Sequence, residues 1–383
     1  MLQTAGLRSD FVLMTDGPAI IRLTRALPSS ASEVAVALAG VDWNWLAVDA
    51  GRHGLSGVVN RLVADGLPVP SRVAARVRAD SFALAASSLR AKALLFRALE
   101  AMARRGVRPI LLKGYGLAAR LYPDPLMRPT SDVDLLACRD EYAEAEQALL
   151  DIGLEPTRLE PSEEAKKDHH VPNFWGHEKW FNGDAGLVEL HWRPLSGFGT
   201  AIGVAGAFAR WRESELEGRR VYYLSAEDEL VYLAAHAAKH LLGRLSWLYD
   251  IKLFLHQEPH IDFEQVRQIA AESEMNAAVY FALEAVQRLR AQLPPTLLRA
   301  LGASAWQRML AARLFSDEEL ARSPYADRKY ATYLLRLLMT SNLKTRALAS
   351  WSLFDQARQR TVNHHLPQLI QRMRQAHRGE QCS

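Results

Sequence analysis

Cysteine is almost absent from this chain of 383 residues, which contains only Cys138 and Cys382. Two cysteines so far apart match no metal-ligand spacing and build no disulfide framework of the kind that small secreted domains use. The N-terminal segment also lacks an unbroken apolar stretch, because Asp10 and Asp16 interrupt it. We therefore expect no signal peptide and a location in the reducing cytoplasm.

Long uncharged apolar runs and a large excess of one charge are missing as well. The best candidate for a membrane span, 82–96, contains Arg90 and Lys92, so no membrane contact is expected. A net charge of +4 permits an anionic ligand but does not indicate a protein that coats nucleic acid. The arginines of 346–378 are mixed with glutamine, which favours a solvated helical face over a nucleic-acid contact.

Several familiar catalytic fingerprints do not occur. The sequence has no P-loop, no dinucleotide-binding glycine pattern and no nucleophile elbow. His177-Glu178 lacks the second histidine of a zinc protease motif. What is present is an ordinary globular composition, 49% hydrophobic and 23% charged, at a length that allows two or three domains.

The hydrophobic periodicity divides the chain into three regions. The pattern is helical up to residue 106 and again from 225 onward, whereas the block between them alternates between strand and helix signals. In that block 177–181 and 187–192 flank Asn182-Gly183-Asp184, a strong hairpin signal. We therefore predict an α+β fold in which a small mixed-sheet core (107–195) lies between helical regions (1–106 and 196–383). The predicted elements of the core are strands at 107–112, 132–137, 154–159, 177–181 and 187–192, and helices at 114–122 and 139–151.

An Asp-x-Asp pair lies on one of these predicted strands. Asp132 and Asp134 alternate with Val133 and Leu135, so both carboxylates point to the same face. Neighbouring carboxylates repel unless a cation lies between them, and Mg²⁺ or Mn²⁺ is the expected one. Glu189 is the best third acid, because Val188 and Leu190 flank it and a charge in such a setting is costly unless it binds something.

A glycine-containing turn precedes the acidic pair. Lys113, Gly114, Tyr115 and Gly116 follow one predicted strand and open a helix. Glycine lets the backbone approach a phosphate, and a helix N-terminus offers unpaired N–H groups. We expect Lys113, Gly114 and Gly116 to bind phosphate oxygens.

Two further residues near the acidic pair are candidates for the same contact. Arg128 suits bidentate binding of a phosphate, and Ser131 directly precedes Asp132.

The segment LLKGYGLAARLYPDPLMRPTSDVDLL resembles the nucleotidyltransferase superfamily that contains DNA polymerase β. It resembles more closely a family of uncharacterised bacterial nucleotidyltransferases, and the likeness extends to VELHWRP at 188–194 and HAAKHLLGRLSWLYDI at 236–251. The resemblance covers roughly 40–260. It implies metal ligation by Asp132 and Asp134, Glu189 as the third acidic position, and Gly114 in a phosphate-proximal turn. Tyr115 departs from the superfamily, which usually has Gly-Ser or Gly-Gly at this turn.

Several other polar residues are candidates for the substrate site. His236 and His240 share one helix face, and Arg244 and Asp250 follow on the next helix. Together they are expected to line the place where the acceptor binds; the alternatives are packed histidines and a structural Arg244–Asp250 ion pair. His191 lies on the same strand face as Glu189, so it either hydrogen-bonds a carboxylate or phosphate or packs.

These observations predict a Mg²⁺-dependent nucleotidyltransferase that moves a nucleoside monophosphate from a nucleoside triphosphate to an acceptor. The acceptor would be a small metabolite, a sugar, a peptide or a protein. Two other functions stay open at this point. One is a non-catalytic binding or regulatory module that keeps the fold, and the other is a glycosyltransferase whose Asp-x-Asp holds the metal of a nucleotide-sugar.

Overall fold

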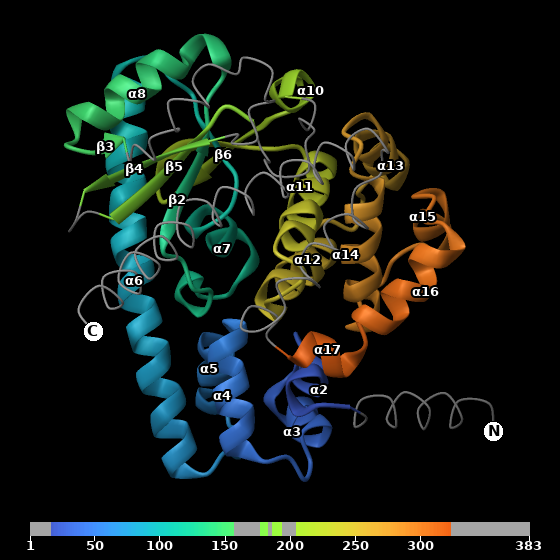
Figure 1. Cartoon of the computed structure of the whole chain (residues 1–383). Coiled ribbons are helices and arrows are strands. Elements are labelled where there is room, and N and C mark those ends of the chain that lie inside the picture. The colour runs from blue at the N-terminus through green and yellow to red at the C-terminus, as the bar shows by residue number, and fades with distance from the viewer. Residues whose placement is uncertain (1–16, 157–176, 183–185, 194–203, 323–383) are drawn as a thin grey trace, which may run out of the picture.

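The computed structural model describes residues 17–156, 177–182, 186–193 and 204–322. A seven-stranded mixed sheet lies between helices, as the sequence predicted for the fold class (Figure 1). The predicted Arg-rich segment 346–378 lies outside the described residues. No helix in the described part of the chain combines the length and apolar character that crossing a bilayer requires.

Helices precede the sheet. Gly54, at φ 72°, ends one of them, and so the helical pattern around 51–57 forms two helices rather than one. The last and longest has 34 residues and contains neither glycine nor proline. These elements are α2 (Ala19–Ala26), α3 (Ala31–Ala37), α4 (Trp43–His53), α5 (Ser56–Ala64) and α6 (Ser71–Arg104).

The strands follow the order β3-β4-β5-β2-β1-β7-β6. β2 pairs in parallel with β5, and β1 in parallel with β7, whereas the other neighbours are antiparallel. The predicted hairpin is therefore confirmed as β4–β5. The strands are β1 (Ile110–Leu111), β2 (Asp132–Leu136), β3 (Glu155–Pro156), β4 (His177–Asn182), β5 (Gly186–His191), β6 (Arg212–Leu216) and β7 (Arg219–Tyr223).

The hairpin β6–β7 was not predicted from the sequence, because only helices were expected after residue 195. Its strands turn at Glu217 and Gly218, both with positive φ. Exposed polar residues occupy most of β6, so the strand shows no alternation of apolar and polar residues. Through β7 this hairpin extends the sheet beyond β1.

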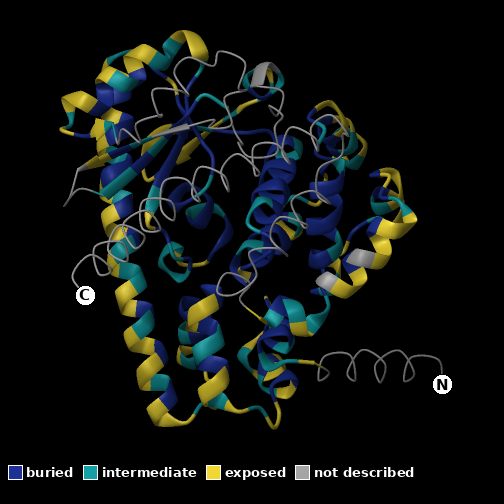
Figure 2. Ribbon diagram, viewed as in Figure 1, coloured by how far each residue is buried: buried dark blue, intermediate teal, exposed yellow. Residues whose placement is uncertain are grey.

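Two apolar cores cover the two faces of the sheet. On one face, Val133, Leu135, Val188 and Leu190 pack with α6 and with α8 (Tyr142–Asp151). On the other, Leu136 and Leu112 of the sheet region join a large core that includes the C-terminal helices. Figure 2 shows that α6 has exposed residues on one side and buried or partly buried ones on the other. Because strand residues alternate, Asp132, Asp134 and Glu189 point away from α6.

The remaining elements connect the strands or follow the sheet. Ser225 caps the helix that begins at Ala226, since its side chain accepts the backbone N–H of Asp228. These elements are α7 (Tyr115–Leu121), η1 (Pro125–Met127), η2 (Arg139–Glu141), α10 (Val204–Ala209), α11 (Ala226–Lys239), α12 (Leu245–Gln257), α13 (Phe263–Glu272), α14 (Asn276–Arg288), α15 (Pro295–Ala300), α16 (Ala305–Leu314) and α17 (Asp317–Ala321).

Candidate functional site

The parallel register of β2 and β5 brings the predicted acids together. Asp134 is the direct partner of Glu189, and Leu136 is the partner of His191. Partners in a sheet project to the same face, so Asp134, Glu189 and His191 share the face that Asp132 also occupies. The sheet thus joins residues that lie more than fifty positions apart.

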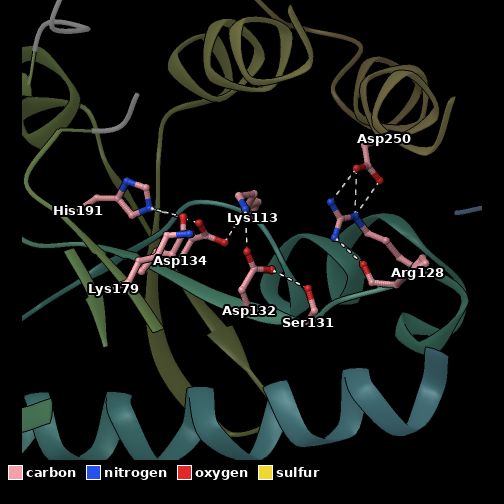
Figure 3. A network of polar contacts seen from close by, with 10 residues as sticks. Lys113, Arg128, Ser131, Asp132, Asp134, Lys179, His191 and Asp250 are labelled. Atoms are coloured by element: carbon pink, nitrogen blue, oxygen red, sulfur yellow. Dashed lines mark hydrogen bonds and ion pairs between the residues drawn. The ribbon is translucent and has the colours of Figure 1, made fainter. Parts of the chain in front are cut away.

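Lys113 provides a cation between the two carboxylates of β2. Its Nζ lies 3.3 Å from Oδ2 of Asp132 and 2.9 Å from Oδ2 of Asp134 (Figure 3). Burial alone would lower the pKa of Lys113, but the charges of Asp134 and Asp132 outweigh it and raise that pKa. The ammonium group therefore stays charged and offsets the repulsion within the Asp-x-Asp pair.

Asp134 is the most deeply buried of the acids, with 2% of its surface exposed. His191 Nε2 lies 3.2 Å from its Oδ1 and 3.8 Å from Oε2 of Glu189. Burial would raise the pKa of Asp134, yet Lys113 and His191 hold it below its ordinary value. The carboxylate is thus kept ionised inside the protein, as a metal ligand must be.

A residue that sequence reasoning missed, Lys179 on β4, contacts the third acid. Its Nζ lies 3.2 Å from Oε1 of Glu189. Lys179 and Glu189 are direct partners in the β4–β5 hairpin. The hairpin signal in the sequence carried this information, because counting back from the turn along both strands pairs the two residues.

The chemistry of these donors suits a cation. Ligand atoms of Asp134, Glu189 and His191 all lie within 4.8 Å of one another. Two carboxylates and an imidazole match Mn²⁺ well, and the carboxylates match Mg²⁺. Asp132 is separate from this trio but shares Lys113 with Asp134. The residues present therefore fit a divalent ion.

The glycine turn between β1 and α7 has a conformation that only glycine adopts easily. Gly114 has φ 71° and ψ −138°, and a Cβ there would lie 3.4 Å from the carbonyl oxygen of Asp132. Gly116 has a packing reason instead, because a Cβ there would lie 2.8 Å from a methyl carbon of Leu111. The Tyr115 hydroxyl donates to Glu217 at 2.6 Å, so it faces the β6–β7 turn. Phosphate contacts by Gly114 and Gly116 stay predictions.

The structure places Arg128 with Asp250 rather than beside Lys113. Its Nε and Nη2 donate to the Asp250 carboxylate at 2.9 to 3.0 Å, and Tyr122 donates to the same carboxylate at 2.8 Å (Figure 3). Asp250 thus takes Arg128 as its cation, in place of the Arg244 that the sequence suggested. Ser131 is exposed, and its hydroxyl lies 3.5 Å from Oδ1 of Asp132.

The other substrate candidates form a separate ring cluster on α11 and α12. His236 lies 4.8 Å from His240 and 5.3 Å from Trp247, measured between ring centroids. The guanidinium carbon of Arg244 lies 5.6 Å from the Trp247 ring. Tyr232, which sequence reasoning missed, continues the cluster inward at 6.1 Å from His236. Three of the four candidates in this stretch, His236, His240 and Arg244, are therefore brought together around Trp247, and Asp250 is not among them.

Comparison with known protein families identifies a match over most of the chain. A model of the family described as uncharacterised nucleotidyltransferases matches residues 39–291, a range that contains every site residue described above. No curated protein and no solved structure matches the chain.

Proposed function

Because the chain belongs to the uncharacterised nucleotidyltransferase family, we propose that it transfers a nucleoside monophosphate from a nucleoside triphosphate to an acceptor hydroxyl. We propose Mg²⁺ or Mn²⁺ as its metal. The order of glycine turn, Asp-x-Asp and third acid also supports membership of the DNA polymerase β-like superfamily. The acceptor is a small molecule, a sugar, a peptide or a protein.

One observation carries this proposal, namely the register that sets Asp134 beside Glu189. Nucleotidyl transfer needs little covalent chemistry from the protein, which mainly positions groups and neutralises charge. A cluster of three acids, two of which share the partly buried Lys113, is suited to that task. A binding module without catalysis would have no need to keep Asp134 ionised at the cost of burying it.

The proposed ligands are Asp132, Asp134 and Glu189, with His191 beside them. When bound, a divalent ion would neutralise phosphate oxygens and make the acceptor hydroxyl more acidic. Lys113 would exchange its carboxylate partners for oxygens of the triphosphate, next to the turn at Gly114. Glu189, at the β4 side of the cluster, would receive the proton of the acceptor.

The proposed reaction exchanges one bond to the α-phosphorus for another. The acceptor oxygen forms a bond to the α-phosphorus, and the bond from that phosphorus to the oxygen bridging the β-phosphate breaks. Pyrophosphate leaves with the electron pair of the broken bond. The Lys113 ammonium group, held 2.9 Å from Asp134 in the structure, would offset the charge that develops on the leaving group.

Calorimetric titration tests the proposal directly. ATP, CTP, GTP and UTP are titrated with and without MgCl₂ into the wild type and into Asp132→Asn, which changes a partly exposed side chain. Asp140→Asn is the matched control, because Asp140 is exposed on η2. We expect Mg²⁺-dependent binding that Asp132→Asn abolishes and Asp140→Asn leaves intact.

Folded wild type that binds no triphosphate would overturn the proposal. Tighter binding of a nucleotide-sugar such as UDP-glucose would favour glycosyl transfer, and binding of neither would favour a non-catalytic module.

A further inference from the structure

A continuous series of ring side chains leads from the acidic centre toward the surface. Tyr232 and His236 are 1% and 9% exposed, whereas His240 and Trp247 are partly exposed. Trp247 contacts both histidine rings, at 5.3 Å from His236 and 5.0 Å from His240. We call His236, His240 and Trp247 the ring wall. Its inner end is buried and its outer end reaches solvent.

The inner end of the ring wall lies close enough to Lys113 and Asp134 for their charges to act on it. Burial lowers the pKa of His236, the Lys113 ammonium lowers it further, and the Asp134 carboxylate raises it. Burial likewise raises the pKa of Tyr232, and Asp134 and Lys113 both act on this hydroxyl. The same two charged residues therefore influence both α11 side chains.

The turn that carries the outer end is strained. Leu241 and Leu242 both have a left-handed backbone, with φ of 57° and 55°. Such a conformation is unfavourable for residues other than glycine and asparagine, and it is retained where the surrounding structure needs it. Here it ends α11 just after His240 and starts α12 with Arg244 at the N-cap. The exposed Arg244 side chain is thereby set over the Trp247 ring.

The proposed donor contains one flat heteroaromatic group, its base. We propose that the ring wall and Arg244 bind the nucleobase of the nucleoside triphosphate, an inference that rests on the proposed function. Bases stack on aromatic side chains and on arginine, and neutral imidazoles can also hydrogen-bond to base edges. An acceptor, by contrast, need not be flat. The ring wall therefore discriminates among donors rather than among acceptors.

The strand order agrees with this assignment. In the sheet, β2 lies between β5 and β1. Glu189 is on β5, whose second neighbour is β4. Lys113 and Gly114 follow β1, whose second neighbour is β7. The helix α11 comes directly after β7, and α12, which carries Trp247, contacts α7, the helix that follows the turn at Lys113 and Gly114. These contacts place the ring wall on the phosphate side of the acidic centre. The acceptor would approach from the opposite side, where Glu189 meets Lys179.

Two probes separate the base from the phosphates. Sodium tripolyphosphate contains the phosphate chain without base or ribose. It should therefore bind with Mg²⁺, and changes to the ring wall should not alter its affinity. The four nucleoside triphosphates and tripolyphosphate are titrated with MgCl₂ into wild type, Trp247→Leu, Trp247→Phe and His240→Ala. We expect Trp247→Leu to lower the affinity for the preferred nucleotide by about tenfold or more and to leave the affinity for tripolyphosphate unchanged. Trp247→Phe keeps a ring and should lose less.

Trp45→Leu on α4 is the matched control, because Trp45 is 63% exposed, and thermal melts check that every variant is folded. Unchanged nucleotide affinity in Trp247→Leu and His240→Ala would overturn the inference alone, as would an equal loss for both probes. Wild type that binds neither probe would overturn the proposed function and this inference together.

Discussion

Arg128 and Asp250, 122 positions apart in the sequence, form a buried bidentate ion pair. They are 7% and 1% exposed, and Tyr122 donates a further hydrogen bond to the carboxylate. The pair fastens the loop before β2 to α12. Ser88 of α6 fixes the same loop from the other side, since its hydroxyl accepts the Thr130 N–H at 3.0 Å. The lead-in to Asp132 is thus held between two helices.

Breaking this pair from one side should be costly. We expect Arg128→Met or Asp250→Leu alone to lower the free energy of unfolding by about 3–5 kcal/mol, because each leaves a buried charge without its partner. The double variant should lose much less than the sum of the two losses. Urea denaturation of the four proteins measures the coupling, and strictly additive losses would contradict it.

Lys113 should be replaceable by a divalent ion as far as stability is concerned. Lys113→Met leaves Asp134 buried without its ammonium partner, so we expect a loss of about 3–5 kcal/mol in metal-free buffer. MgCl₂ or MnCl₂ should then raise the melting temperature of Lys113→Met more than that of the wild type. KCl at equal ionic strength serves as the control. An equal response of both proteins to Mg²⁺ and Mn²⁺ would be the contrary result.

Acid should destabilise the fold through His53. The ring is buried; its Nδ1 accepts the Leu245 N–H at 3.3 Å, so Nε2 is the donor to the Ala321 carbonyl at 3.0 Å. Burial lowers the pKa of His53. The unfolded state therefore binds more protons than the native state below about pH 6.5, and the free energy of unfolding falls as the pH drops through that range.

Denaturant titrations between pH 5 and 8 measure this dependence. The slope from one histidine is at most about 1.4 kcal/mol per pH unit. His53→Gln should flatten the profile, although His236, whose pKa burial also lowers, keeps part of it. His260→Gln is the control, because His260 is exposed. If the pH profiles of the wild type and His53→Gln have the same slope, His53 does not cause the pH dependence of the free energy of unfolding.

Two glycines should respond in opposite ways to alanine. Gly114→Ala forces an L side chain into φ 71°, ψ −138°, which we expect to cost about 1–3 kcal/mol and to weaken nucleotide binding. Gly51→Ala places alanine in the helix α4, where its Cβ has only the Ser56 hydroxyl nearby, at 3.8 Å. That change should stabilise by up to about 1 kcal/mol. Thermal melts of both variants give the comparison, and a stabilised Gly114→Ala would refute the backbone argument.

Local patterns predicted much of the fold and part of the site. Alternation along β2 was enough to put Asp132 and Asp134 on one face, and the turn signal at 182–184 was enough for the β4–β5 hairpin. Neither pattern states which strand lies next to β2. The contact between Asp134 and Glu189 depends on a parallel pairing whose register no turn determines.

Long-range partners account for what could not be predicted. Arg128 lies only four residues before Asp132, and proximity in sequence suggested a shared ligand. Its true partner, Asp250, is brought in by the packing of α12, for which the local sequence holds no signal. The strand β6 was missed for another reason, since it is an edge strand whose side chains are mostly charged and exposed.

The helix α6 has a mechanical consequence for the whole molecule. At 34 residues it is about 51 Å long, and one part of it packs on α4 and α5 while another forms the floor of the sheet beneath β2 and β5 (Figure 1). This helix contains neither glycine nor proline, two residues at which helices commonly bend. The N-terminal helices and the acidic centre therefore pack on the same continuous helix, and they should unfold in a single cooperative step.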